Sequence, residues 1–357
     1  MNRETANHVA DTIENVARAL AEWTVNRHLK SDPALPDKYG EYWRSDWVGH
    51  VESRFRFLAQ AVALNRPEVF AAALQWTAEA HCGHEENIAD LDLSLRCMRE
   101  VVREEAPTAA LDAVNRCIDA ALNSMECRDD TNRSSLSPDR PHDRLTLSFV
   151  EAILSADDSR AARMIFDAAG SGTSVKAIYC EALQPAMREI GILWHRGDIS
   201  VAEEHLATAT TRDVMARLRT SFPETPQNAP RVLAAAVAGD FHDLGLRMAA
   251  DLLELEGWRA WFLGANVPAD VLIEFLDRWP TQLLLLSAST ALHLRSAAKT
   301  IETIRNVFPA SQLRVLVGGT PFSQIEGLWR DIGADGCGAT LGDTPSAAAE
   351  LFESTSN

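Results

Sequence analysis

Hydrophobic residues recur every three or four positions along the first third of the chain, as they do on one face of an α-helix. Between Thr5 and His28 these positions form a single apolar stripe. The same spacing returns in four further stretches: 47–64, 67–81, 87–103 and 108–125. The pattern predicts an all-α domain, with about five helices, over residues 1–127.

A polar segment separates this domain from a second helical region. Residues 128–143 contain several turn formers and prolines, which predicts a linker. Helical spacing then returns in four stretches: 145–154, 159–169, 174–196 and 201–218. Four such helices are enough for a compact bundle, which we place at residues 144–225. The proline-rich run at 221–230 marks its end.

The hydrophobic period changes in the last third of the chain. Short apolar runs, typical of buried strands, occupy 232–237, 259–263, 283–286 and 314–317. Amphipathic stretches alternate with them at 245–255, 268–279 and 297–308. This alternation predicts a doubly wound parallel sheet over residues 228–357. The fold class is therefore multidomain α and α/β, and ligands of such sheets bind at the carboxyl ends of the strands.

Charge and composition narrow the class of partner. The formal net charge is -17, without a block rich in Lys and Arg, which argues against direct binding to nucleic acid or to anionic membranes. Apolar runs are too short for a membrane span, and the N-terminus does not resemble a signal peptide. The six cysteines are scattered without a C-x-x-C pair, which is typical of a reducing cytoplasm. We therefore expect a cytoplasmic protein.

A histidine and an aspartate stand together directly after the first predicted strand. The sequence Asp240-Phe241-His242-Asp243-Leu244-Gly245 has the form D-x-H-x-x-G. A histidine on such a loop can offer Nε2 to a metal while the carboxylate two residues earlier holds the other ring nitrogen. The same pair also occurs as an ordinary cap or turn, so the motif alone leaves both interpretations open.

The pattern resembles that of cobalamin-binding domains, and two further features extend the resemblance. The apolar run at 283–286 ends in Ser287, where the family has S-x-L, although Ser289 here replaces the leucine. Gly318 and Gly319 follow the next predicted strand. The resemblance implies a Rossmann-like domain that binds cobalamin, with His242 as the lower cobalt ligand. It also implies that the serines, the glycine pair and Gly245 lie along the nucleotide tail.

A second constellation lies in the predicted bundle. Trp194 is followed by nine residues and then by Glu204 and His205. This spacing resembles the Trp-x9-Glu-His signature of CarH-type photoreceptors, which bind adenosylcobalamin. The resemblance implies that Trp194 caps the adenosyl group, that Glu204 and His205 line its pocket, and that His195 takes the upper cobalt position after light removes that group. A core tryptophan and a solvated helix face are the alternatives.

The N-terminal domain is unusually rich in aromatic and basic side chains, among them Trp23, Tyr42, Arg44, Trp47 and Arg54. The whole layout resembles photocobilins, which join a bilin-binding helical domain to a cobalamin module. That resemblance implies biliverdin as a second chromophore in a domain for which a globin-like fold is one option. A helical interaction domain, a haem bound through His50, His81 or His84, or a metal held by the last two histidines are the alternatives.

These observations lead to one main hypothesis and two alternatives. The first is a light sensor in which loss of the adenosyl group changes the state of a homo-oligomer and the binding of an unidentified downstream protein. The second is a corrinoid protein that carries methyl groups for a methyltransferase, and the third is the small subunit of a mutase with a barrel partner. The sequence has no nucleophile elbow, phosphate loop or paired-carboxylate site, so we do not expect an enzyme.

Overall fold

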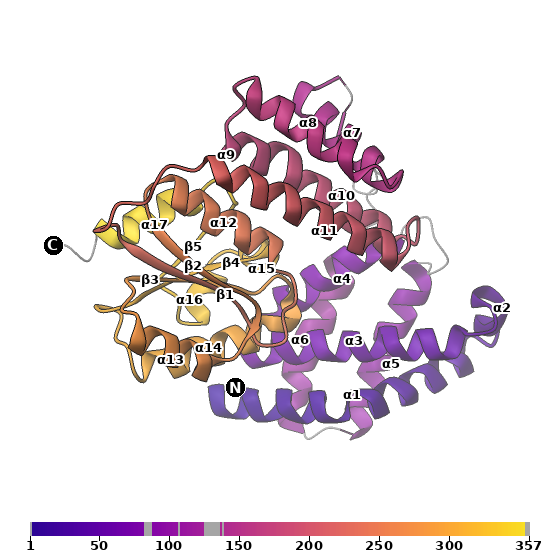
Figure 1. Cartoon of the computed structure of the whole chain (residues 1–357). Helices are drawn as coiled ribbons and strands as arrows, with labels where there is room; N and C mark the ends of the chain where they lie inside the picture. The colour runs from indigo at the N-terminus through magenta and orange to yellow at the C-terminus, as the bar shows by residue number, and fades with distance from the viewer. Residues whose placement is uncertain (1, 82–87, 106–107, 125–135, 138, 354–357) are drawn as a thin grey trace. The chain divides into compact units, whose positions relative to one another are not determined.

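The computed structural model describes residues 2–81, 88–105, 108–124, 136–137 and 139–353. Its internal contacts divide the chain into two compact units (Figure 1). The first unit is Met1–Arg133 together with Thr290–Arg295, and the second is Ser134–Ser289 together with Ser296–Asn357. The predicted bundle and the predicted sheet domain therefore belong to one unit.

The first unit is helical, as the hydrophobic spacing predicts. Its helices are α1 (Arg3–Ser31), α2 (Leu35–Tyr39), α3 (Trp43–Leu64), α4 (Pro67–His81), α5 (Ile88–Glu105) and α6 (Thr108–Ser124). Helix α1 packs along α3 and α5, and α4 packs along α6. The Asn2 side chain caps α1, and α3 ends at Asn65 in a left-handed conformation. The five-residue α2 is too short to show a period, which is why the sequence pattern does not predict it.

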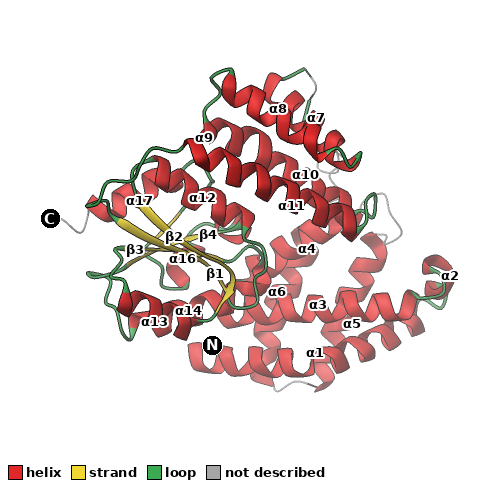
Figure 2. Cartoon of the chain, in the orientation of Figure 1, coloured by secondary structure: helices red, strands yellow, loops and turns green. Residues whose placement is uncertain are grey.

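The bundle contains four helical runs, as predicted, of which the third is irregular. Figure 2 shows this region as helices joined by loops, without strands. The runs are α7 (Pro141–Leu154), α8 (Asp158–Gly170), the sequence α9 (Val175–Ile178), η1 (Tyr179–Leu183) and α10 (Gln184–His195), and finally α11 (Val201–Leu218). The η1 segment is a π-helix, a form that is rare and is often found at functional sites. Helix α7 begins inside the predicted linker because Pro141, in the first turn, favours helix initiation.

The C-terminal domain is a five-stranded parallel sheet in the order β2-β1-β3-β4-β5. Its strands are β1 (Arg231–Val237), β2 (Arg259–Val267), β3 (Leu283–Ser287), β4 (Arg314–Gly318) and β5 (Gly336–Cys337). The longer helices are α12 (Leu244–Leu255), α13 (Ala269–Arg278), α14 (Leu294–Arg305) and α17 (Thr344–Glu353), with short α15 (Thr320–Gln324) and α16 (Leu328–Asp331) between them. Helices α12 and α17 cover one face, and α13 and α14 cover the other (Figure 1). The doubly wound prediction is confirmed.

The ends of several elements differ from the sequence prediction. Strand β2 continues four residues past the predicted end at 263, to Val267. Its last part contains Gly264 and Asn266 with positive φ angles of 83° and 54°, and the pairing register shifts there. Such a bulge breaks the alternation of side chains that a sequence pattern detects. The two-residue β5 was missed for a similar reason, since it is too short for any period.

Candidate functional site

The loops that follow β1, β3 and β4 meet at one edge of the sheet, because these three strands are neighbours and parallel. The β1 loop turns at Gly239, whose φ is 89°. Its backbone N–H donates to the side-chain oxygen of Asn266 at 2.8 Å, and the backbone N–H of Asn266 donates to the carbonyl oxygen of Asp240 at 2.8 Å. The end of β2 therefore holds the loop that carries the predicted cobalt ligand.

Asp240 is fully buried and organises this loop. Its Oδ1 accepts from the backbone N–H of His242 at 3.0 Å and lies 3.1 Å from the ring Nδ1. Ser289 donates its backbone N–H to Oδ2 and its hydroxyl to Oδ1, each at 2.7 Å. Burial alone would raise the pKa of this carboxyl, but the hydrogen bonds from His242 and Ser289 outweigh it and lower the pKa to about 2. Asp240 is therefore an ionised acceptor at neutral pH.

The imidazole of His242 is oriented by that carboxylate and remains open to solvent. Its side chain is 71% exposed. The hydrogen bond to Asp240 is the main reason that the pKa of His242 is raised; neighbouring protein atoms that partly desolvate the ring act in the opposite direction, and the charges of Asp240, Glu204 and Asp243 add to the rise. The Nδ1 atom also lies 3.1 Å from the Ser289 hydroxyl. Since the proton sits on Nδ1, the lone pair of the neutral ring is on Nε2, which is the arrangement that a metal ligand requires.

Gly318 and Gly319, at the end of β4, have different surroundings. Gly319 has a φ of 126°, and a Cβ at that position would lie 2.0 Å from the carbonyl oxygen of Ala288. Only glycine fits there, so the β4 loop packs directly against the serine stretch Ser287–Ser289. Gly318 has nothing within 4 Å of where its Cβ would stand. The resemblance implied that the nucleotide tail lies along this pair, which stays a prediction; the close neighbour of Gly319 in the structure is the Ala288 backbone, while Gly318 and Gly245 face open space.

The residues that the sequence assigned to the upper side of the cofactor lie at the end of α10 (Trp194 and His195) and at the start of α11 (Glu204 and His205). Trp194 is 46% exposed, so the alternative of a core tryptophan is wrong. His195 follows it and is half-buried. Glu204 accepts a hydrogen bond from the Thr208 hydroxyl at 2.8 Å and lies 2.5 Å from the ring of His205, whose side chain is 75% exposed. The charge of Glu204 is one of the smaller causes that raise the pKa of His242.

Two site contacts were not foreseen from the sequence. Ser289, expected only as a departure from the family leucine, is the donor that fixes Asp240. Arg212 of α11 makes two hydrogen bonds, at 2.8 and 3.2 Å, to the carboxylate of Asp243. Neither contact leaves a local pattern, because the partners are far apart in sequence.

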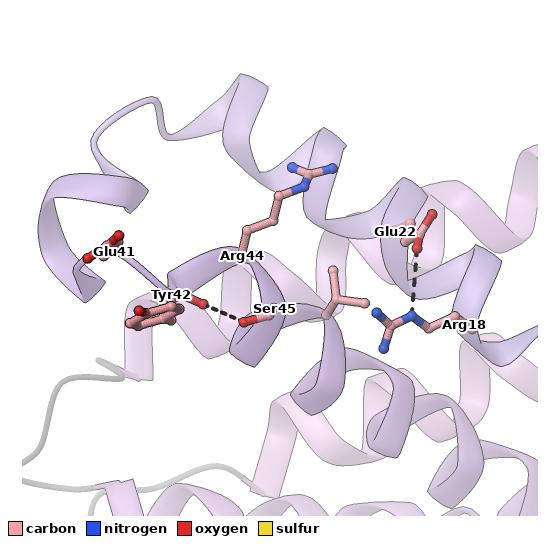
Figure 3. Close-up of a pocket in the computed structure, with 7 residues that line it drawn as sticks. Arg18, Glu22, Glu41, Tyr42, Arg44 and Ser45 are labelled. Atoms are coloured by element: carbon pink, nitrogen blue, oxygen red, sulfur yellow. Dashed lines mark hydrogen bonds and ion pairs between the residues drawn. The ribbon is translucent and has the colours of Figure 1, made fainter.

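The first unit distributes its aromatic residues between core and surface. Trp47, Arg54 and Phe55 are buried, whereas Trp23, Tyr42 and Trp76 are exposed. An open groove of about 460 Å³ lies beside Tyr42 (Figure 3). Its lining residues are Arg18, Glu22, Glu41, Tyr42, Arg44, Ser45 and Val48. His50 is exposed, while the side chain of His81 and the whole of Cys82 and His84 lie outside the described residues.

A buried polar cluster in the same unit offers a possible set of metal ligands: His28, Asp32 and Asp90. Lys38 already holds both carboxylates, at 2.6 and 2.9 Å. The indole N–H of Trp47 donates to Nδ1 of His28 at 3.2 Å, so the neutral ring carries its proton on Nε2. Neither ring nitrogen is then free to bind a cation, and the cluster is an internal ion pair beside a neutral imidazole.

Together, a helical bundle beside a doubly wound domain and an exposed, carboxylate-oriented histidine at the sheet edge define a metal-cofactor-binding module. Residues 148–219 and 230–350 each match a family model described as a B12 binding domain. This part of the chain belongs to the B12-binding domain families, and the protein is a cobalamin-binding protein. The side chains fit such a group, because the ring of His242 is exposed and Gly318 and Gly245 leave space along the same edge.

Curated relatives include proteins of two kinds. The dimethylamine corrinoid protein of Methanosarcina barkeri is 24% identical over 213 residues, 59% of this chain and 98% of that protein. Dimethylamine corrinoid protein 3 of Methanosarcina acetivorans is 25% identical, over 48% of this chain and 80% of that protein. The HTH-type transcriptional repressor CarA of Myxococcus xanthus is 33% identical over 131 residues, 36% of this chain and 43% of that protein.

The fold also matches a solved structure. The monomethylamine corrinoid protein of Methanosarcina barkeri superposes with a TM-score of 0.52 at 18% identity, over 58% of this chain and 98% of that protein. The shared architecture is the helical cap with a Rossmann-like domain. Among the described residues, moreover, every helix is too short or too polar to cross a bilayer.

Proposed function

We propose that the protein is a light sensor that holds adenosylcobalamin between the bundle and the edge of the sheet. The observation that carries this proposal is Trp194, whose ring is 46% exposed at the end of α10 instead of packing in the core. Glu204, on the next helix, acts electrostatically on His242. A protein that carries methyl groups has to leave the upper face of its cobalamin open to a second protein. A tryptophan ring and a carboxylate from the helical bundle would instead cover that face and suit an adenosyl group.

The residues of the site take separate roles in this proposal. His242 binds cobalt from below through Nε2, and Asp240 with Ser289 holds the ring in that orientation. Trp194 covers the adenosyl group, and Glu204 accepts hydrogen bonds from its ribose hydroxyls, with His205 beside it. Adenosylcobalamin supplies a cobalt–carbon bond that light breaks. His195, directly after Trp194, is the imidazole that would take the upper cobalt position once the adenosyl group has gone.

The output we propose is a change in the oligomeric state of this chain and in its binding to another protein. The first unit would hold biliverdin as a second chromophore. The groove of Figure 3 supports this, because Arg44 lines it, bonded to the neutral side chain of Asn26, and guanidinium groups bind propionates well. Arg18 also lines the groove but is already paired with Glu22 and Glu52. The exposed ring of Tyr42 offers a flat wall beside them.

A methyl-carrying corrinoid protein is the second candidate, and the relatives favour it. Two dimethylamine corrinoid proteins match over 80% and 98% of their own lengths. In this function His242 keeps the same role, but the upper face has to admit a methyltransferase partner. The two candidates therefore differ in what Trp194 and Glu204 do.

The deciding experiment compares cobalamins in the dark and under green light. The full chain is mixed with adenosyl-, methyl- or hydroxocobalamin, with and without biliverdin, and followed by absorption and size-exclusion chromatography. A sensor retains the adenosyl form preferentially and changes both its spectrum and its elution volume on illumination. Equal retention of the methyl form, with an elution volume that light leaves unchanged, would instead support the methyl carrier.

A further inference from the structure

Helix α11 is joined to α12 at two places along one face. Arg212 bonds Asp243 at the start of α12, and Arg219, in the turn directly after α11, bonds Asp251 in the middle of α12. The two arginines are seven residues apart, which is two helical turns and about 10 Å along the axis. The bundle and the sheet domain therefore share two ionic contacts of different character.

The contact at Asp251 is deeply buried. Asp251 and Tyr179 are both 0% exposed, and the Tyr179 hydroxyl donates to the carboxylate at 2.8 Å. Arg219 and Arg247 both bond the other carboxylate oxygen, and Arg219 also reaches Glu254 at 2.9 Å. Tyr179 opens the π-helical segment, so the irregular turn of the bundle stands at this contact. Burial raises the pKa of Asp251 to about 7, and separating these groups would leave a buried carboxyl without its hydrogen-bond partners, which makes the contact hard to open.

The contact at Asp243 is more exposed and lies beside the cobalt ligand. The side chain of Arg212 is 52% exposed and that of Asp243 is 9% exposed, so water reaches this pair from the arginine side. Asp243 has one charged partner here, whereas the fully buried Asp251 bonds two arginines and a tyrosine, so the Asp243 contact is the easier of the two to open. Asp243 directly follows His242 in the chain. Because the two residues are adjacent, a displacement of His242 also displaces the backbone of Asp243 and so changes the geometry of its ion pair with Arg212.

We propose that α11 is a lever that pivots at the buried Asp251 contact and is held closed by a releasable latch, the Arg212–Asp243 pair. The inference rests on the proposed function and extends it, because it connects the cobalt ligand His242 to the position of helix α11 of the bundle. Ala202, at the far end of the helix, is 17 residues from Arg219, about 25 Å of helix, against about 10 Å for Arg212. A small tilt about Arg219 that separates Arg212 from Asp243 thus displaces the Glu204 end of α11 more than twice as far as it displaces Arg212.

The test measures distances in the full chain without cobalamin, so that it does not depend on cofactor binding. Spin labels are attached through a ketone-bearing unnatural amino acid at exposed positions, and double electron–electron resonance gives the distances. One pair, Ala202 and Glu256, reports the lever end, and a second pair, Thr220 and Glu256, reports the pivot. Latch variants are Asp243→Asn and Arg212→Gln, the pivot variant is Asp251→Asn, and the matched control is the exposed Asp213→Asn on α11.

In the latch variants the Ala202–Glu256 distribution should broaden or shift by several ångströms, while the Thr220–Glu256 distribution stays as in wild type. Asp251→Asn should change both distributions, and Asp213→Asn neither. The lever is refuted if the latch variants leave the Ala202 distances unchanged, if both pairs change equally, or if the wild-type Ala202 distribution is already as broad as theirs. Failure of the cobalamin proposal would show instead as absent binding in the spectra, whatever these distances are.

Discussion

Substitution of Asp240 by asparagine should loosen the loop that presents His242. The carboxylate accepts four hydrogen bonds, from the N–H and ring of His242 and from the N–H and hydroxyl of Ser289. An asparagine keeps the shape, but its NH₂ group must face at least one of these donors. Hydrogen bonds to a charged group that are lost in this way leave buried polar atoms unpaired.

The magnitude follows from the shifted pKa. A carboxyl whose pKa falls from 3.8 to about 2 on folding contributes about 2 kcal/mol of stability, since one pKa unit is about 1.4 kcal/mol. Because the folded pKa is depressed, this contribution is complete at neutral pH and is lost only as pH falls through the range from about 4 to about 2. At pH 7, Asp240→Asn should therefore remove about 2 kcal/mol from the local stability of the sheet edge.

Hydrogen exchange followed by mass spectrometry is the suitable assay, because the chain has two units and global unfolding is not a single transition. Peptides from β1 and from the β3 loop should exchange roughly thirtyfold faster in Asp240→Asn, which corresponds to about 2 kcal/mol. Peptides from α3 and α5 serve as the internal reference, and Asp213→Asn is the control variant. An acceleration below about twofold at β1 would refute the reasoning about buried acceptors.

Four shorter predictions follow. His242→Ala should bind cobalamin more weakly and without histidine coordination in the absorption spectrum, whereas an unchanged spectrum would exclude this ligand. Trp194→Ala should still bind cobalamin but lose its preference for the adenosyl over the methyl form in competition assays; wild-type preference would remove the main support for a sensor. Gly319→Ala should lower the melting temperature because its Cβ meets the Ala288 carbonyl, while Gly318→Ala should melt as wild type does; equal melting would contradict this. Burial lowers the pKa of His28, so the stability of the first unit should fall as pH drops below 6.5. Urea unfolding at pH 7.5 and 5.5 measures this loss, and His28→Gln should reduce it. An equally steep loss in the variant would show that another group is responsible.

The local part of the site was predictable because its residues are neighbours in sequence. Asp240 and His242 are two residues apart on a loop after a strand, a spacing at which a carboxylate reaches an imidazole, and the structure has this contact at 3.1 Å. The alternating pattern predicts a parallel sheet, although it does not give the order of the strands within it. The loop motifs after β1, β3 and β4 therefore had to lie at the same edge of a parallel sheet.

Contacts between distant residues left no such pattern. Ser289 is 49 residues from Asp240, and its role as donor depends on the register that places β3 beside β1. The partners Arg212 and Asp243 are 31 residues apart and belong to separate elements. The π-helical turn at Tyr179 likewise escaped prediction, because a periodic stripe does not distinguish one widened turn within a longer helix.

The most direct test of His242 as the cobalt ligand is electron paramagnetic resonance of the bound cobalamin in its cobalt(II) form. The protein is prepared with natural histidine and with histidine labelled with ¹⁵N. Coordination by His242 predicts that the superhyperfine triplet from ¹⁴N becomes a doublet on labelling, and that this doublet is absent from labelled His242→Ala. A triplet that persists in the labelled wild-type protein would show that the lower ligand is the nucleotide base of the cofactor, and would contradict the assignment of His242.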